Sequence, residues 1–76
     1  MAYFTVKYQG NNLDIALDSD EVQVTRLKNH ILPKFKSDVK FQDLNILLVQ
    51  NNTEYLLDNN EVIDSDLDLV LEVNSS

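Results

Sequence analysis

The sequence has no cysteine and no tryptophan, and only one glycine, one proline and one histidine among its 76 residues. Without cysteine, neither a disulfide framework nor a thiolate metal site can stabilise the fold, and this composition fits the nucleus or cytoplasm. A single glycine excludes the glycine-rich loops that cradle phosphate groups. Because Gly10 and Pro33 stand alone, the turns must use Asn and Asp, which tolerate a positive φ.

Long hydrophobic runs and positive charges are also scarce. No apolar run approaches the ~18 residues of a membrane span, and the N-terminal residues alternate instead of forming a signal-peptide core. The chain carries 13 acidic and 6 basic residues, a net charge of −7. Because such a surface repels phosphate and anionic lipid, we expect no direct nucleic-acid or membrane binding. A protein partner with a basic rim is the natural complement of a monomeric acidic domain.

Patterns that would support catalysis or metal binding are missing. His30 is the only histidine, and on a helix it is expected to be a partly exposed surface residue. The acidic stretches 18–21 and 58–68 lack the glycine and the closing glutamate of a calcium loop, so we expect them to form solvated surface. We therefore expect no enzymatic activity, no metal and no cofactor.

The patterns that are present indicate extended structure first. Residues 3–8 and 13–18 alternate between apolar and polar, which is typical of β-strands with one buried face. The turn between them, at residues 9–12, contains Gly10, which can adopt a positive φ. The sequence thus predicts a hairpin whose apolar face needs a cover.

A short helix, about residues 24–32, is the predicted cover. Val24, Leu27 and Ile31 fall on one helical face, and Pro33 cannot continue the helix. The acidic pair at 20–21, just before it, suits the positive end of a helix. Such a short helix is marginal alone and depends on packing.

The second half of the chain is predicted to complete the sheet. A turn is expected at residues 51–52, and both Val62 and Ile63 are expected to insert into the core. The last strand alternates most clearly and is expected to lie centrally, beside the first strand. The extended segments expected after the helix are 44–49, 55–57 and 67–73.

Apolar residues on both faces of the later strands suggest a binding surface. If Leu44, Ile46 and Leu48 point inward, their neighbours point outward. Exposed apolar patches commonly mark binding sites. A register shift by one residue, or a cover formed by residues 33–42, would bury the patch instead. The expected apolar anchors are Leu47, Val49 and Val70, with Asp68 and Glu72 beside them to pair with basic residues of the partner.

Along nearly its whole length the chain resembles the ubiquitin-like superfamily. The segment VTRLKNHI at 24–31 is similar to the helix of that fold, and LDLVLEV at 67–73 is similar to its last strand. The resemblance implies an α+β, ubiquitin-like β-grasp fold: a mixed four- or five-stranded sheet with one crossing helix. We expect one domain at residues 1–73 and a flexible tail at 74–76. No glycine follows Gly10, so the chain lacks the Gly-Gly end that conjugated modifiers need, and we expect a domain of a larger protein.

A more specific resemblance is to the DWNN domain, a ubiquitin-like variant. VKY at 6–8, LKNHI at 27–31 and QDLNILLVQNNTEYLLDNNEVI at 42–63 are similar to segments of that family. The matching positions in the last segment are Asp43, Leu44, Asn51, Thr53, Glu54, Tyr55, Asp58 and Ile63. The family's proline after the isoleucine is Asp64 here, its basic tail is absent, and so is its Asp-Gly step before the helix. The resemblance implies the N-terminal module of a RING-type ubiquitin ligase in pre-mRNA 3′-end processing.

Other interpretations remain open. A generic adaptor domain of the ubiquitin–proteasome pathway would have the same fold and the same lack of catalysis. An acidic PB1-type heterodimerisation domain would use a compact acidic loop, to which residues 58–68 are a loose match. A Ras-association-type domain would present basic residues to its partner, which this charge disfavours. A small enzyme or metal protein is disfavoured by the absent cysteine and the single histidine.

Overall fold

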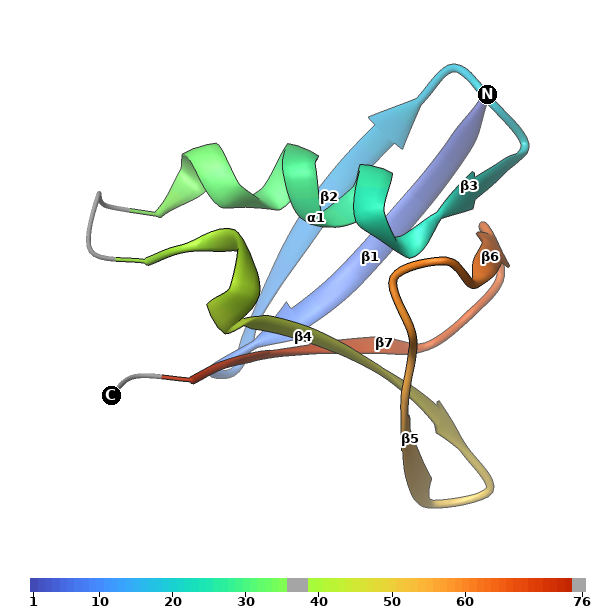
Figure 1. Cartoon of the computed structure of the whole chain (residues 1–76). Helices are drawn as coiled ribbons and strands as arrows, with labels where there is room; N and C mark the ends of the chain where they lie inside the picture. The colour runs from blue at the N-terminus through green and yellow to red at the C-terminus, as the bar shows by residue number, and fades with distance from the viewer. Residues whose placement is uncertain (36–38, 75–76) are drawn as a thin grey trace.

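The chain forms a mixed β-sheet crossed on one face by one α-helix in the residues that the computed structural model describes, 1–35 and 39–74 (Figure 1). The elements are β1 (Ala2–Tyr8), β2 (Asn11–Leu17), β3 (Glu21–Gln23), α1 (Val24–Ile31), the 3-10 helices η1 (Leu32–Lys34) and η2 (Phe41–Asp43), β4 (Leu44–Gln50), β5 (Thr53–Leu56), β6 (Val62–Asp64) and β7 (Leu69–Val73). The main sheet has the order β2-β1-β7-β4-β5, and β3 pairs with β6 separately. The expected fold class, an α+β β-grasp, is confirmed.

Two-residue turns close both hairpins of the main sheet. Gln9 and Gly10 adopt φ values of 50° and 79° between β1 and β2, and Asn51 and Asn52 adopt 53° and 63° between β4 and β5. Turns with positive φ at both positions match the right-handed twist of the strands that they join. The positive φ expected at Gly10 and the turn expected at residues 51–52 are therefore confirmed.

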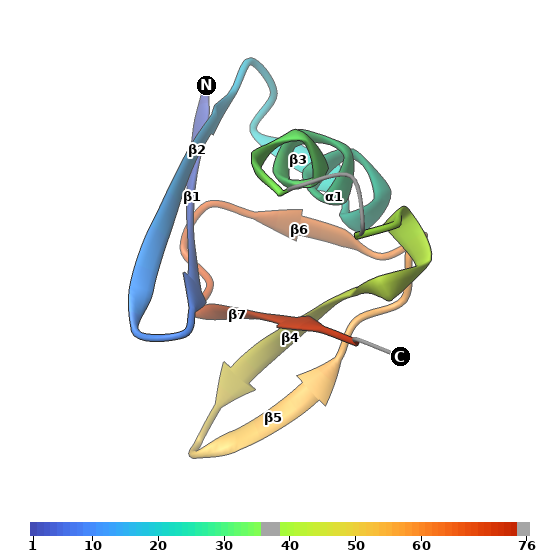
Figure 2. The ribbon, with the colours of Figure 1, turned by 90° about the vertical axis from the view of Figure 1, so that its left-hand side faces the viewer.

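The last strand occupies the centre of the sheet, as expected. β7 runs parallel to β1, with Val6 opposite Leu69, and antiparallel to β4, with Leu48 opposite Leu69. It begins at Leu69 and not at residue 67, and Leu67 packs half-buried against the core from the preceding link. Figure 2 shows the strong twist of the sheet, with the β1–β2 hairpin steeply inclined to β4 and β5.

The core lies between α1 and the sheet. Val24, Leu27 and Ile31 are 0% exposed, which confirms the predicted apolar face. The helix ends at Ile31, and the chain continues as η1, with Pro33 in its first turn, where a missing N–H costs no hydrogen bond. Phe35 packs edge-on against Tyr8, with ring centroids 5.3 Å apart, and so extends the core toward one end of the sheet.

The helix N-terminus is held by a distant loop. The residue before it, Gln23, makes no side-chain cap, and the first helical turn contains no acidic residue. The N–H of Val24 donates to the carbonyl of Glu61 at 2.9 Å, and the N–H of Thr25 donates to the carbonyl of Asn59 at 3.1 Å. The Thr25 hydroxyl donates to the same Asn59 carbonyl at 2.9 Å. Backbone carbonyls thus take the N–H groups that a capping side chain would otherwise bind.

This arrangement corrects two expectations. The acidic pair at 20–21 does not lie at the helix N-terminus, because β3 intervenes, and Asp20 pairs instead with the N-terminal ammonium at 3.3 Å. Val62 does not insert into the core. It is 57% exposed whereas Ile63 is buried, because neighbouring residues of strand β6 point to opposite faces.

The last described residue of the chain is tied to the sheet. The N–H of Asn74 donates to the carbonyl of Asp43 at 2.8 Å, beyond the expected domain boundary at residue 73. Residues 75 and 76 of the expected tail lie outside the described residues. None of the helices within 1–35 and 39–74 has the length and apolarity that a membrane crossing requires.

The largest losses of stability are expected from truncating side chains that are buried between α1 and the sheet. Leu27→Ala removes a fully buried side chain between α1 and the sheet, so it is expected to lower the free energy of unfolding by about 2–5 kcal/mol. The matched control, Leu56→Ala, truncates a leucine that is 60% exposed, and its effect is expected to stay within about 0.5 kcal/mol. Urea unfolding followed by circular dichroism measures both values, and equal losses would contradict the assignment of the core.

Candidate protein-binding surface

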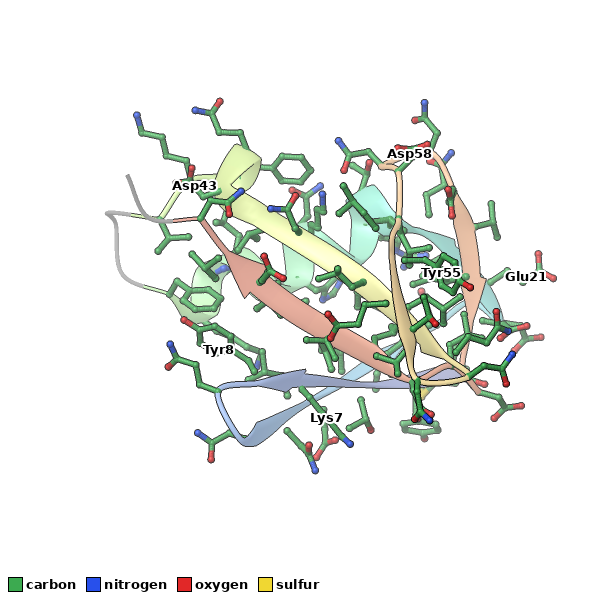
Figure 3. All side chains as sticks on the ribbon, turned by 90° about the horizontal axis from the view of Figure 1, so that it is seen from below. Lys7, Tyr8, Glu21, Asp43, Tyr55 and Asp58 are labelled. Atoms are coloured by element: carbon green, nitrogen blue, oxygen red, sulfur yellow. The ribbon has the colours of Figure 1, made fainter. Side chains whose placement is uncertain are left out.

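A row of apolar side chains crosses the face of the sheet opposite α1. Strand pairing places Val70 opposite Leu47, and Leu47 opposite Leu56. Lys7 lies opposite Val70 at the other end of this row. Residues that pair across strands project to the same face, so these four side chains are neighbours. Figure 3 looks at the molecule from this side, with Lys7 labelled on β1.

The predicted anchor residues lie where the strand parity puts them. Leu44 and Ile46 are fully buried, and Leu48 packs against the core, so Leu47 and Val49 project to the opposite face. Leu47, Val49 and Val70 are all half-buried. We call Leu47, Val49, Leu56 and Val70 together the open-face patch.

Leu56 belongs to this patch although the sequence pattern of β5 does not single it out. All four residues of β5 are exposed, so no burial period marks one face of the strand. The β4–β5 turn determines the position of Leu56. Because the turn has two residues, 51 and 52, Gln50 pairs with Thr53. Three residues further from the turn on each strand, Leu47 therefore pairs with Leu56. At 60% exposure, Leu56 is the most exposed member of the patch.

Carboxylates border the open-face patch. Glu72 is exposed on β7 opposite Asn45, and Glu54 lies opposite Val49. Asp68 is exposed just before β7, and its backbone carbonyl accepts a hydrogen bond from the N–H of Val49 at 2.9 Å. The structure therefore brings both predicted acidic residues next to the predicted apolar anchors.

A hollow over the β1–β2 hairpin widens the same face of the sheet. Its volume is about 350 Å³, and its walls include Tyr3, Thr5, Asp14 and Ala16. The Thr5 hydroxyl donates to Asp14 Oδ1 at 3.1 Å, which ties the two strands together across the hollow. Tyr3 is 66% exposed. The accessible apolar surface thus extends past Lys7 onto the N-terminal hairpin.

A second cleft lies at the side of the sheet, near the helix. It has a volume of about 310 Å³, and we call it the Lys28 cleft. In Figure 3, Asp43 and Asp58 mark this margin of the sheet, where the chain enters β4 and leaves the β5 region. Its lining includes Lys28, Phe41, Asn45, Leu56, Asp58 and Asn59.

Lys28 is the unusual residue of this cleft. It is 5% exposed and is the one charged residue that is buried in the described part of the chain. Its Nζ donates to Asn59 Oδ1 at 2.6 Å and lies 5.6 Å from the ring centroid of Phe41. Burial lowers the pKa of Lys28 below its usual value of 10.5, because desolvation penalises the charged amine.

The other charged contacts are at the surface. Arg26 Nη2 donates to Asp18 Oδ1 at 2.6 Å, and this guanidinium, through that hydrogen bond, lowers the pKa of the exposed Asp18 carboxyl. His30 is exposed on α1. Within residues 1–35 and 39–74, no three His, Asp or Glu side chains gather into a group that could hold a metal ion.

A scan against protein-family models and a search of curated proteins find no match for this chain.

The burial of Lys28 predicts a pH dependence of stability. The buried amine loses its proton at a lower pH than the same amine in the unfolded chain, so the unfolded state binds more protons in the interval between the two pKa values. The free energy of unfolding of the wild type is therefore expected to rise relative to that of Lys28→Met as pH increases toward 10.5. Urea unfolding of both proteins over this pH range measures the difference. A difference that does not depend on pH would contradict the desolvated charge.

Proposed function

We propose that this chain is a non-catalytic, ubiquitin-like protein–protein interaction domain that binds its partner through the open-face patch. The observation that carries the proposal is that Val70, Leu47 and Leu56 pair across neighbouring strands and form a row on the sheet face opposite α1. The described residues of the segment that precedes β4 do not cover this row: Phe35 and Val39 pack against the core. Exposed apolar residues in a contiguous patch with a polar rim are typical of an interaction site.

The charges around the patch support a basic partner. Asp68, Glu72 and Glu54 border it, and the whole chain carries a net charge of −7. Complementary charges speed up association and exclude partners of like charge, while the desolvated apolar centre supplies most of the affinity. A patch of four apolar residues favours a weak, transient complex. We further propose that the domain is monomeric and acts in the nucleus or cytoplasm, which its lack of cysteine fits.

The finer proposal is that the domain is the N-terminal, DWNN-like module of a RING-type ubiquitin ligase or pre-mRNA 3′-end processing factor. It rests on the resemblance of residues 42–63. In the structure the matching residues hold fold-defining positions: Leu44 and Ile63 are buried, and Asn51 forms the β4–β5 turn. These positions support the proposed DWNN-like type of domain. The open-face patch would determine which partner the domain binds. A generic adaptor of the ubiquitin–proteasome pathway would use the same patch.

An acidic PB1-type heterodimerisation domain is the second candidate. The observation that favours it is the exposure of every carboxylate in the segment 58–68. These carboxylates are spread over a turn, over β6 and over the link to β7, and they face solvent. On this candidate, binding would depend on charge in the segment 58–68 and would weaken steeply with salt, since exposed charges are screened.

The proposal predicts that two new carboxylates on the open face abolish binding. A Leu47→Asp/Val70→Asp double variant is expected to lose its partners in an affinity pull-down from nuclear and cytosolic extract, because a buried unpaired charge opposes the apolar contact. Circular dichroism checks that the variant is folded. Val62→Asp is the matched control, because it adds a carboxylate at an exposed valine of β6, outside the patch.

The outcomes separate the candidates. Partners that are lost with the double variant but kept with the control support the open-face patch. Partners that survive the double variant, but are lost when Asp64 and Asp66 are changed to Asn, would overturn it in favour of the acidic PB1-type interaction. Identification of the captured proteins by mass spectrometry then tests the finer proposal of a ligase or 3′-end processing complex.

A further inference from the structure

The side chain of Lys28 is buried, and its ammonium has no ion-pair partner among residues 1–35 and 39–74. Within the described residues, the ion pairs are those of Asp20 with the N-terminus and of Asp18 with Arg26. Lys28 Nζ has three N–H donors, and its hydrogen-bond partner is the neutral amide oxygen of Asn59. Buried charges in proteins are normally paired, because removing an ion from water is costly. A buried lysine side chain whose ammonium has no carboxylate partner among the described residues is therefore unusual in so acidic a chain.

The surroundings of the ammonium suit a carboxylate. Phe41 and Asn59, which both contact Lys28 Nζ, are also walls of the Lys28 cleft, so the donor group faces the cleft. The other walls include the leucines of residues 56–57, which can pack against the methylene groups of an acidic side chain. Hydrogen bonds between an ammonium and a carboxylate are among the strongest in proteins when water is excluded.

The acidic rim restricts which anion can enter. Asp58 lines the same cleft and is exposed, and it does not come within ion-pair distance of Lys28. A phosphate group carries up to two negative charges, so Asp58 repels it more strongly than it repels one carboxylate. A single ammonium at the base of a small, partly apolar cleft thus favours a singly charged group on an apolar stem.

The cleft is continuous with the open-face patch. Leu56 belongs to both, and Asn45 lines the cleft while projecting to the same sheet face as Leu47. A bound segment that lies on Leu47 and Val70 can therefore continue past Leu56 into the cleft. The two surfaces form one path from the centre of the sheet to the helix.

We propose that the Lys28 cleft binds a glutamate or aspartate side chain of the same protein partner that the open-face patch holds. This inference rests on the proposed protein-binding function and adds a specificity element to it. The partner segment would carry apolar residues for the patch, basic residues for its acidic rim, and one carboxylate that reaches Lys28. The ammonium would then exchange its single neutral acceptor for an ion pair, and Asn59 would remain as its second partner.

The test uses a small probe, because the partner is unidentified. The ¹⁵N-labelled protein is titrated with an acetylated, amidated leucine–glutamate dipeptide and, separately, with its leucine–glutamine counterpart. The glutamate probe is expected to bind at least roughly tenfold more tightly, with saturable shifts at the Asn59 side-chain amide and at the Leu57 N–H, because only it forms a charge-assisted hydrogen bond. Binding is also expected to raise the pKa of Lys28, followed by its side-chain NMR signals.

Variants separate this inference from the proposed function. Lys28→Met is expected to remove the preference for glutamate, whereas Lys7→Met, which removes an exposed lysine at the end of the open-face row, is expected to keep it. The folded Leu47→Asp/Val70→Asp double variant is also expected to keep the preference, because neither residue lines the cleft. Equal binding of the two dipeptides to the wild type, or a glutamate preference that survives Lys28→Met, would overturn the inference. The wild-type comparison decides the matter even if Lys28→Met fails to fold.

Discussion

The structure depends on how one eight-residue helix is held against the sheet. A helix of this length is not stable alone, and α1 has no side-chain cap at its N-terminus. The carbonyls of Asn59 and Glu61 bind its first N–H groups, and the side chain of Asn59 accepts the hydrogen bond of Lys28 one turn further along. The β3–β6 pair joins the residues just before α1 to the residues just after this turn. Hydrogen bonds thus connect the helix, the 58–61 turn and this small sheet, and they hold α1 over the core.

One helix can cover only one face of a sheet, and this constraint creates the candidate site. β4 and β7 are central strands, so their inner residues must be apolar to form the core beneath α1. No second layer formed by residues 1–35 and 39–74 covers their outer side chains, yet Leu47 and Val70 are apolar as well. Packing on the helix side does not require this choice. The excess of apolar residues on the uncovered face is thus the feature on which the proposed binding function rests.

The parts of the fold that local chemistry determines could be predicted from the sequence. Alternating residues predict β1, β2 and β7, the helical stripe predicts α1, and Gly10 and the asparagine pair at 51–52 predict the hairpin turns. The β3–β6 pair could not be predicted, because three-residue strands are too short to show a period and form only through tertiary pairing. The helix cap was inaccessible for the same reason: its acceptors lie more than thirty residues away and are backbone atoms, which carry no sequence signal.

The candidate site, likewise, could be predicted from the sequence only in part. Strand parity predicts that Leu47, Val49 and Val70 share a face, whereas Leu56 joins them only through the register that the β4–β5 turn imposes. In the sequence Lys28 is one more polar position on an amphipathic helix. Its side chain is buried in the structure, where Phe41 from η2 and Asn59 from the 58–61 turn both lie close to its ammonium. A buried cation costs stability wherever it is unpaired. In the function that we propose, a partner's carboxylate would offset this cost, and Lys28 would distinguish partners with a carboxylate from those without one.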